Sequence, residues 1–269
     1  MTSQPQSPAP ARLTALVTGA SSGIGLDLAE ILAKHGHDLI LVARTGATLD
    51  RLAADLSTKY HISATPIPAD LSDPTTPQRL YDDLIARNVT VDLLINNAGF
   101  GLFGPFAKQD VHRILDLIQV NITSLAALTR LFLPGMIARN RGRVMNVAST
   151  AGFQPGPYMA VYYASKAYVI SFTEAVSEEL RHTNVTFTAL CPGPTRTNFA
   201  DVAQITMTNL LNTPFVMSSM DVARYGYDAM MRGQRIAIPG PINRVVAFSN
   251  RLVPRRVATA ISRRLLERR

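Results

Sequence analysis

The chain has 269 residues, of which 47% are hydrophobic and 17% are charged. This composition excludes an intrinsically disordered chain, which would be poor in apolar residues and rich in net charge. The single cysteine, Cys191, excludes a disulfide scaffold and any CxxC metal or redox site. Residues 1–250 hold 20 Lys/Arg against 18 Asp/Glu, whereas residues 251–269 hold seven Arg and one Glu. The basic character therefore belongs to a tail, and the body carries no footprint of nucleic-acid binding.

Segments typical of strands and of helices alternate along the chain. Short apolar runs predict strands at 13–17, 38–43, 64–67, 93–96, 143–147, 186–190 and 235–238. Apolar residues at helical spacing predict helices at 24–35, 46–60, 74–88, 108–119, 121–139, 161–182 and 221–232. Repeated strand–helix units predict an α/β fold, a doubly wound parallel sheet with helices on both faces.

Three regions differ in composition. Residues 1–12 are rich in Ser, Gln, Pro and Ala, so we expect a disordered leader, and we expect no secretory signal and a cytoplasmic location. Residues 13–250 are expected to form one domain. Residues 251–269 are expected to form a basic amphipathic tail.

A glycine-rich turn joins the first predicted strand to the first predicted helix. Gly19 permits a tight turn, Gly23 lets the backbone approach a pyrophosphate, and Gly25 lets the helix pack closely on the sheet. The helix N-terminus then offers free N–H groups to phosphates. The position of the turn favours a dinucleotide site over a plain turn. The predicted cofactor contacts in this turn are Thr18, Gly19, Ser21, Ser22, Gly23, Ile24 and Gly25.

Further motifs appear in a fixed order, and together they resemble the short-chain dehydrogenase/reductase family, the single-domain branch of about 250 residues. The motifs are TGASSGIG at 18–25, Asn96-Asn97-Ala98-Gly99, Ser149, Tyr162-x-x-x-Lys166 and Pro192-Gly193-x-x-x-Thr197. The similarity covers about residues 13–240. It implies a single-domain Rossmann-type fold, a nicotinamide dinucleotide cofactor and hydride transfer. It places further cofactor contacts at Asp70, Leu71, Asn97, Ala98, Gly99, Tyr162, Lys166, Pro192, Gly193, Thr195 and Thr197.

The end of the second strand indicates which nicotinamide cofactor is bound. An acidic residue there would hold the ribose 2′-hydroxyl of NAD, but residues 41–45 contain no carboxylate. Arg44 stands there instead, and a guanidinium matches a phosphate. We therefore expect NADP(H), with Thr45 as an added hydroxyl donor, although a solvated arginine at a strand end is the simpler alternative. Asp70 has an alternative as well, because it or Ser72 can cap the next helix.

Tyr162 and Lys166 are four residues apart on a predicted helix, so their side chains share a face. A free phenol has a pKa of about 10, and a nearby ammonium lowers that pKa by favouring the phenolate. We therefore expect Lys166 to help Tyr162 act as an acid and base. Tyr163 is the obvious competitor, but only Tyr162 has the four-residue spacing.

The resemblance completes the catalytic set with two polar residues. Ser149 would polarise a substrate carbonyl, and Asn121 would hold a water that links Lys166 to solvent. A turn or capping serine and a helix N-cap are the structural alternatives for these two residues. The five histidines and Cys191 show no ligand spacing, so we expect no metal site.

Three apolar segments are expected to line the substrate side, at 100–106, 153–159 and 198–220. They favour a small hydrophobic ketone, aldehyde or secondary alcohol, of the 3-oxoacyl, steroid or aryl ketone type. The alternatives are a non-catalytic NADPH-binding regulator, and an epimerase or dehydratase on the same fold. The resemblance implies a homodimer or homotetramer built on the helices at 121–139 and 161–182.

The tail combines an apolar stripe with arginines. Val253, Val257, Ile261 and Leu265 recur at a spacing of four residues, which predicts one helical face. Such a helix either docks on its own subunit or a neighbour, which we favour, or lies weakly on an anionic membrane surface.

Overall fold

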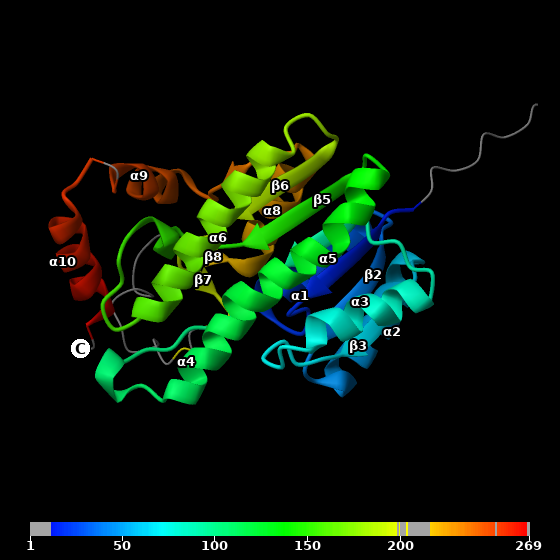
Figure 1. The fold of residues 1–269 in the computed structure, drawn as a ribbon, viewed down its shortest axis with the longest axis horizontal. Helices are drawn as coiled ribbons and strands as arrows, with labels where there is room; N and C mark the ends of the chain where they lie inside the picture. The colour runs from blue at the N-terminus through cyan, green and yellow to red at the C-terminus, as the bar shows by residue number, and fades with distance from the viewer. Residues whose placement is uncertain (1–11, 198, 200–202, 204–215, 251, 268–269) are drawn as a thin grey trace, which may run out of the picture.

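The predicted strands form one parallel sheet, as Figure 1 shows for the computed structural model. The structure describes residues 12–197, 199, 203, 216–250 and 252–267. In spatial order the strands are β3 (Ala64–Pro68), β2 (Asp38–Ala43), β1 (Thr14–Thr18), β4 (Leu93–Asn96), β5 (Gly142–Val147), β6 (Val185–Leu190) and β9 (Ile236–Ala237). A separate parallel pair is formed by β7 (Thr195–Arg196) and β8 (Met217–Ser218). The expected doubly wound parallel sheet is confirmed.

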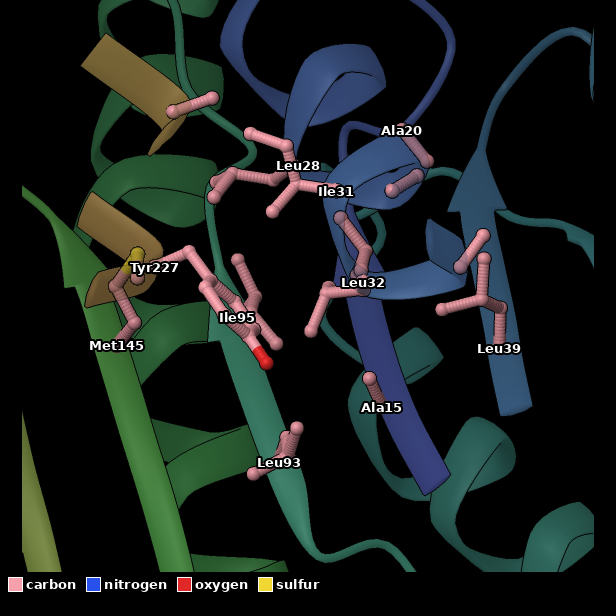
Figure 2. Close-up of a cluster of buried hydrophobic side chains, with 14 of the residues drawn as sticks. Ala15, Ala20, Leu28, Ile31, Leu32, Leu39, Leu93, Ile95, Met145 and Tyr227 are labelled. Carbon is pink, nitrogen blue, oxygen red and sulfur yellow. The ribbon is translucent and has the colours of Figure 1, made fainter. Parts of the chain in front are cut away.

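The helices cover both faces of this sheet. They are α1 (Gly23–Lys34), α2 (Gly46–Tyr60), α3 (Thr76–Ala86), α4 (Val111–Ile118), α5 (Leu125–Ala138), α6 (Ala160–Glu179), α8 (Ser219–Met231), α9 (Pro241–Ser249) and α10 (Arg255–Leu266). One core lies between the sheet and α1, α2 and α8, where Leu28 and Leu32 of α1 meet Ile95 of β4 (Figure 2). A second core lies between the other face and α3, α5 and α6. Because both faces are covered, the central strands are apolar at nearly every position.

The order of the strands reverses beside β1. The chain runs outward from β1 through β2 to β3, then returns to place β4 on the other side of β1. In an open parallel sheet the carboxyl ends of the strands leave a crevice at such a point, and ligands bind there. The topology therefore fixes where a site is expected before any side chain is considered.

Two predicted helices are one continuous helix in the structure. The expected break between 108–119 and 121–139 is instead a π-helical segment, Gln119–Ser124, which joins α4 to α5. The π segment widens one turn without ending the helix, and such segments often occur at functional sites. The combined helix, Val111–Ala138, is long and apolar enough to cross a membrane, with a mean hydropathy of 1.4 over its most apolar part. Its inner face instead packs in the core through residues such as Leu128 and Phe132.

The C-terminal elements correct the sequence analysis. The apolar stripe predicted for the tail is wrong as a packing face, because Val257 and Ile261 are exposed while Ala258, Ser262 and Leu266 are buried. The buried face is thus displaced by one residue, and α10 docks on its own subunit. The sequence analysis also missed α9, and it made the last strand longer than the two residues of β9.

The N-terminal boundary also differs in detail. Residues 1–11 of the expected leader lie outside the described residues. Arg12, which we assigned to the leader, donates a hydrogen bond to the carbonyl oxygen of His61 at 2.7 Å. Arg12 therefore belongs to the folded body.

Replacing Gly25 by alanine tests how closely α1 packs on the sheet. A Cβ at position 25 would overlap the carbonyl oxygen of Gly19 and the side-chain amide of Asn97. We expect Gly25→Ala to lower the free energy of unfolding by about 1–3 kcal/mol, as overpacking does, in a urea titration. The matched control is Gly46→Ala in the first turn of α2, where the nearest atom to a Cβ is Pro68 Cγ at 3.2 Å. Equal stability of the two variants would contradict this packing.

Candidate active site

A cavity of about 540 Å³ opens at the carboxyl edge of the sheet, at the reversal of strand order. It brings together motifs that are far apart in the sequence. Of the predicted site residues, those that line it are Gly19, Ser21, Ser22, Gly23, Ile24, Arg44, Thr45, Asp70, Leu71, Asn97, Ala98, Gly99, Ser149, Tyr162, Lys166, Pro192, Gly193, Thr195 and Thr197. The other three, Thr18, Gly25 and Asn121, do not line the cavity. They lie behind its wall and support it.

The glycine turn presents backbone to the cavity. Gly19 and Gly23 have φ angles of 66° and 55°, in the left-handed region that favours glycine. A Cβ at Gly23 would lie 3.1 Å from the methyl group of Thr197, so the turn and the loop after β6 are close together. The N-terminus of α1 follows, and the side chain of Ser22 makes no capping hydrogen bond there. Free N–H groups at this helix end form a site for an anion.

Thr18 and Asn97 tie the glycine turn to the end of β4. The Nδ2 atom of Asn97 donates to the carbonyl oxygens of Thr18 at 2.8 Å and Gly19 at 3.1 Å. In return, Thr18 Oγ1 accepts from the backbone N–H groups of Asn97 and Ala98, each at 3.0 Å. The sequence analysis placed both residues among the cofactor contacts. In the structure, both side chains hold the cavity wall in shape.

Charged residues stand at the ends of β2 and β3. Arg44 follows β2, lines the cavity and is exposed. Within the described residues, no carboxylate lies within ion-pair distance of its guanidinium. Asp70 follows β3, and its Oδ1 accepts from the backbone N–H and the hydroxyl of Ser72, both at 2.9 Å. Asp70 thus shapes its own loop, while Arg44 is available to a ligand.

Tyr162 and Lys166 lie on the first turns of α6 and are both buried. Lys166 Nζ donates to the carbonyl oxygen of Val147 at 2.7 Å and lies 5.8 Å from the centre of the Tyr162 ring. Burial lowers the pKa of Lys166 to about 8. Burial also raises the pKa of Tyr162, and hydrogen bonding from Ser149 opposes this only in part. We expected the nearby ammonium to lower the pKa of Tyr162, but in this structure burial dominates, and Lys166 directs its ammonium at a carbonyl oxygen.

Ser149 lies just past β5 and has two sets of contacts. Its hydroxyl donates to the carbonyl oxygen of Pro192 at 3.3 Å and accepts from the N–H of Ala151 at 3.1 Å. It therefore caps the short helical turn Thr150–Phe153, as the structural alternative proposed. The same side chain also lines the cavity and lowers the pKa of Tyr162 by hydrogen bonding. Ser149 therefore caps the turn and is also within hydrogen-bonding reach of Tyr162.

Asn121 lies in the π segment and is buried beside the β4 loop. Its Oδ1 accepts from the N–H of Phe100 at 3.1 Å, and its Nδ2 donates to the carbonyl oxygen of Phe100 at 3.0 Å. The Nδ2 atom also donates to Ser165 Oγ at 3.1 Å. The N-cap alternative is wrong, because the helix continues through this residue. Asn121 instead joins the β4 loop to α6, close to Lys166.

Aromatic and aliphatic side chains form the other wall of the cavity. The ring of Phe199 lies 5.2 Å from the ring of Tyr162, and Phe100 and Met159 also line the cavity. Much of the expected segment 198–220, including Val202, Ile205, Met207, Leu210, Leu211 and Phe215, lies outside the described residues. The sequence analysis missed the contribution of α9 and α10. The residues that these two helices bring to the cavity are Ile242, Asn243, Val246 and Leu265.

The remaining titratable groups do not form a metal centre in the described parts of the chain, which hold no cluster of three His, Cys, Asp or Glu residues suited to an ion. Cys191 is buried, and burial raises the pKa of its thiol. His37 is also buried and contacts the hydroxyl of Tyr227 at 3.0 Å. Both residues serve the packing of the fold.

Comparison with known proteins places this site in a family. The family model described as short chain dehydrogenase matches residues 13–207. A very-long-chain 3-oxoacyl-CoA reductase of Bos taurus is 32% identical over 212 residues, which cover 77% of this chain and 67% of the reductase. The chain spans about half to two thirds of the length of the 3-oxoacyl-CoA reductases that it matches.

Solved structures agree in fold. A short-chain dehydrogenase from Sphingobium yanoikuyae in complex with NADPH has a TM-score of 0.81 and 32% identity, covering 89% of this chain and 93% of that one. A short-chain dehydrogenase/reductase from Burkholderia phymatum in complex with NAD has a TM-score of 0.79 and 26% identity, covering 95% and 97%. The chain therefore belongs to the short-chain dehydrogenase/reductase family of oxidoreductases, which bind a nicotinamide cofactor.

Proposed function

We propose that this protein is an NADPH-dependent oxidoreductase that transfers a hydride between the nicotinamide and a hydrophobic ketone or aldehyde, or the corresponding secondary alcohol. One observation carries the proposal. A single cavity joins a glycine turn and the unpaired guanidinium of Arg44 to half-buried Ser149 and to the buried side chains of Tyr162 and Lys166. The first part suits a dinucleotide, and the second suits proton transfer to a carbonyl oxygen.

The residues present fit the cofactor. The left-handed turn at Gly19 and Gly23 leaves backbone N–H groups open to a pyrophosphate. Arg44, free of any carboxylate in the described chain, suits a 2′-phosphate and therefore favours NADPH over NADH. Pro192 and Gly193 would hold the nicotinamide end, near Tyr162. When bound, the cofactor supplies or accepts the hydride at the carbonyl carbon.

The protein's own side chains handle the proton and the developing charge. Tyr162 donates its hydroxyl proton to the carbonyl oxygen during reduction and takes it back during oxidation. Ser149 donates a hydrogen bond to the same oxygen as negative charge develops there. Lys166 supplies positive charge beside Tyr162 and would bind the nicotinamide ribose. Asn121 fixes the β4 loop against α6 and would support proton exchange with Lys166.

The lining of the cavity supports the substrate class. Phe100, Met159 and Phe199 make one wall apolar, and the matched mammalian relative is named a 3-oxoacyl-CoA reductase. We therefore place 3-oxoacyl compounds first, ahead of steroid and aryl ketones. The presence of all four predicted catalytic residues argues against a non-catalytic regulator. A cytoplasmic location and a homodimer or homotetramer built on α5 and α6 stay predictions.

Removal of one hydroxyl tests the role of Tyr162. We expect Tyr162→Phe to lower kcat at least about 100-fold, because general acid–base catalysis typically contributes that much or more, while NADPH still binds. The matched control is Tyr163→Phe, which removes the neighbouring buried hydroxyl. Steady-state kinetics with an aryl ketone measures both. Activity of Tyr162→Phe within tenfold of the wild type, with a large loss in Tyr163→Phe, would move the role to Tyr163.

Charge reversal at Arg44 tests the choice of cofactor. In Arg44→Asp, loss of the charge-assisted pair between Arg44 and the 2′-phosphate should lower kcat/KM for NADPH at least about tenfold. The new carboxylate at position 44 suits the 2′-hydroxyl of NADH. Arg51→Asp is the matched control, since Arg51 is exposed on α2 and does not line the cavity. If the ratio of kcat/KM for NADPH to that for NADH is unchanged in Arg44→Asp, then Arg44 does not determine the choice of cofactor.

A further inference from the structure

Helices α9 and α10 carry an apolar surface that faces solvent. Figure 1 shows the two helices together at one end of the molecule. The apolar side chains that protrude from these helices, and Leu252 between them, are 45–75% exposed, which is unusual for so many large apolar residues close together in the chain. We call this the C-terminal surface, and its members are Ile242, Val245, Val246, Phe248, Leu252, Val257 and Ile261.

The inner faces of both helices are already used for packing. Ala247 of α9 is buried, and on α10 Leu266 joins the cluster that contains Tyr162 and Tyr163. Ser262 is buried on the same face of α10 as Leu266. Because the helices are fixed by these inner residues, their outer apolar side chains are left for a partner.

Arginines alternate in sequence with the apolar residues along these C-terminal elements. Among the described residues of α9 and α10 and their connection, five arginines are exposed, and Glu267 beyond α10 pairs with Arg263 at 2.9 Å. Arg255, Arg256 and Arg264 have no carboxylate within ion-pair distance in the described structure. The C-terminal elements therefore expose both apolar and cationic side chains.

The positive charge discriminates between two candidate partners for the C-terminal surface, a second copy of the chain and an anionic bilayer. A second copy meeting this surface with the same surface would bring unpaired arginines toward one another, which is unfavourable. A bilayer with anionic headgroups offers negative charge to the arginines and an apolar interior to Phe248, Leu252 and their neighbours. The combination of exposed apolar groups and unpaired cations matches the second occupant.

The cavity opens beside the same surface. Ile242 and Val246 are at once exposed members of the C-terminal surface and lining residues of the cavity. Leu265, on the next turn of α10 after Ile261, lines the cavity as well. A molecule dissolved in a bilayer on which this surface rests would therefore meet an apolar path to Tyr162.

We propose that the C-terminal surface docks on anionic phospholipid membranes and that the cavity mouth faces the bilayer when it does so. The docking proposal depends only on the exposed side chains of the C-terminal elements. The entry of a lipophilic substrate from the bilayer rests on the proposed function.

The experiment is co-sedimentation of the full-length protein with vesicles. One set contains equal parts of phosphatidylcholine and phosphatidylglycerol, and the other contains phosphatidylcholine alone. We expect binding to the anionic set to be at least about tenfold tighter at low salt and to weaken as salt is added. Two double variants, Phe248→Ser with Leu252→Ser and Arg255→Gln with Arg256→Gln, should each lose most of the binding, and none of these four residues lines the cavity.

The matched control removes the same types of group elsewhere. Ile85 on α3 is 53% exposed, and Arg51 on α2 is exposed, so Ile85→Ser with Arg51→Gln should bind vesicles as the wild type does.

Turnover of a soluble ketone should be the same in the wild type and in all of these variants. If the wild-type protein does not turn over such a ketone, that result counts against the proposed function and not against docking. Failure of the wild type to bind anionic vesicles would overturn the docking proposal. Self-association that is lost in the Phe248→Ser, Leu252→Ser variant would assign the surface to a second copy instead.

Discussion

Thr18 and Asn97 exchange hydrogen bonds across the point where the sheet reverses its order, and the rest of the site depends on that connection. Asn97 holds two carbonyl oxygens of the glycine turn, and Thr18 holds two N–H groups of the β4 loop. The connection leaves the backbone of Gly19 and Gly23 directed at the cavity and places the N-terminus of α1 beside it. A parallel sheet provides a crevice at this point, and these hydrogen bonds hold the glycine turn and the β4 loop together on one side of it.

The other half of the site holds Tyr162 and Lys166, whose pKa values are set mainly by burial. Burial raises the pKa of Tyr162, so the phenol is a poor acid, and it lowers the pKa of Lys166 to about 8, which still leaves the amine mostly protonated at neutral pH. Lys166 directs its ammonium at Val147 rather than at the phenol. We propose, as the central point of the site's chemistry, that Tyr162 would ionise more readily when the cavity holds the oxidised cofactor, because the positive charge of the nicotinamide would favour the phenolate.

The strands, the glycine turn and the Tyr162–Lys166 spacing were predictable because each is a local pattern in the sequence. The π segment around Asn121 was not, since a one-turn widening leaves the apolar spacing on both sides intact. The prediction of which face of α10 is buried was also wrong, because the apolar residues Val257 and Ile261 are exposed while Ser262 is buried. Periodicity shows that a helix is amphipathic, but the shape of the surface that it meets decides which edge of the stripe is buried. The cavity wall supplied by α9 depended in the same way on tertiary packing.

The most direct test of the central claim is the pH titration of the Tyr162 phenol by ultraviolet difference absorbance, with the Tyr162→Phe protein as the blank. In the cofactor-free protein, we expect Tyr162 to stay protonated above about pH 10, the ordinary pKa of tyrosine. With saturating NADP⁺ we expect Tyr162 to ionise at a clearly lower pH. A phenol that titrates with the ordinary pKa of tyrosine, about 10, both with and without NADP⁺ would contradict the claim.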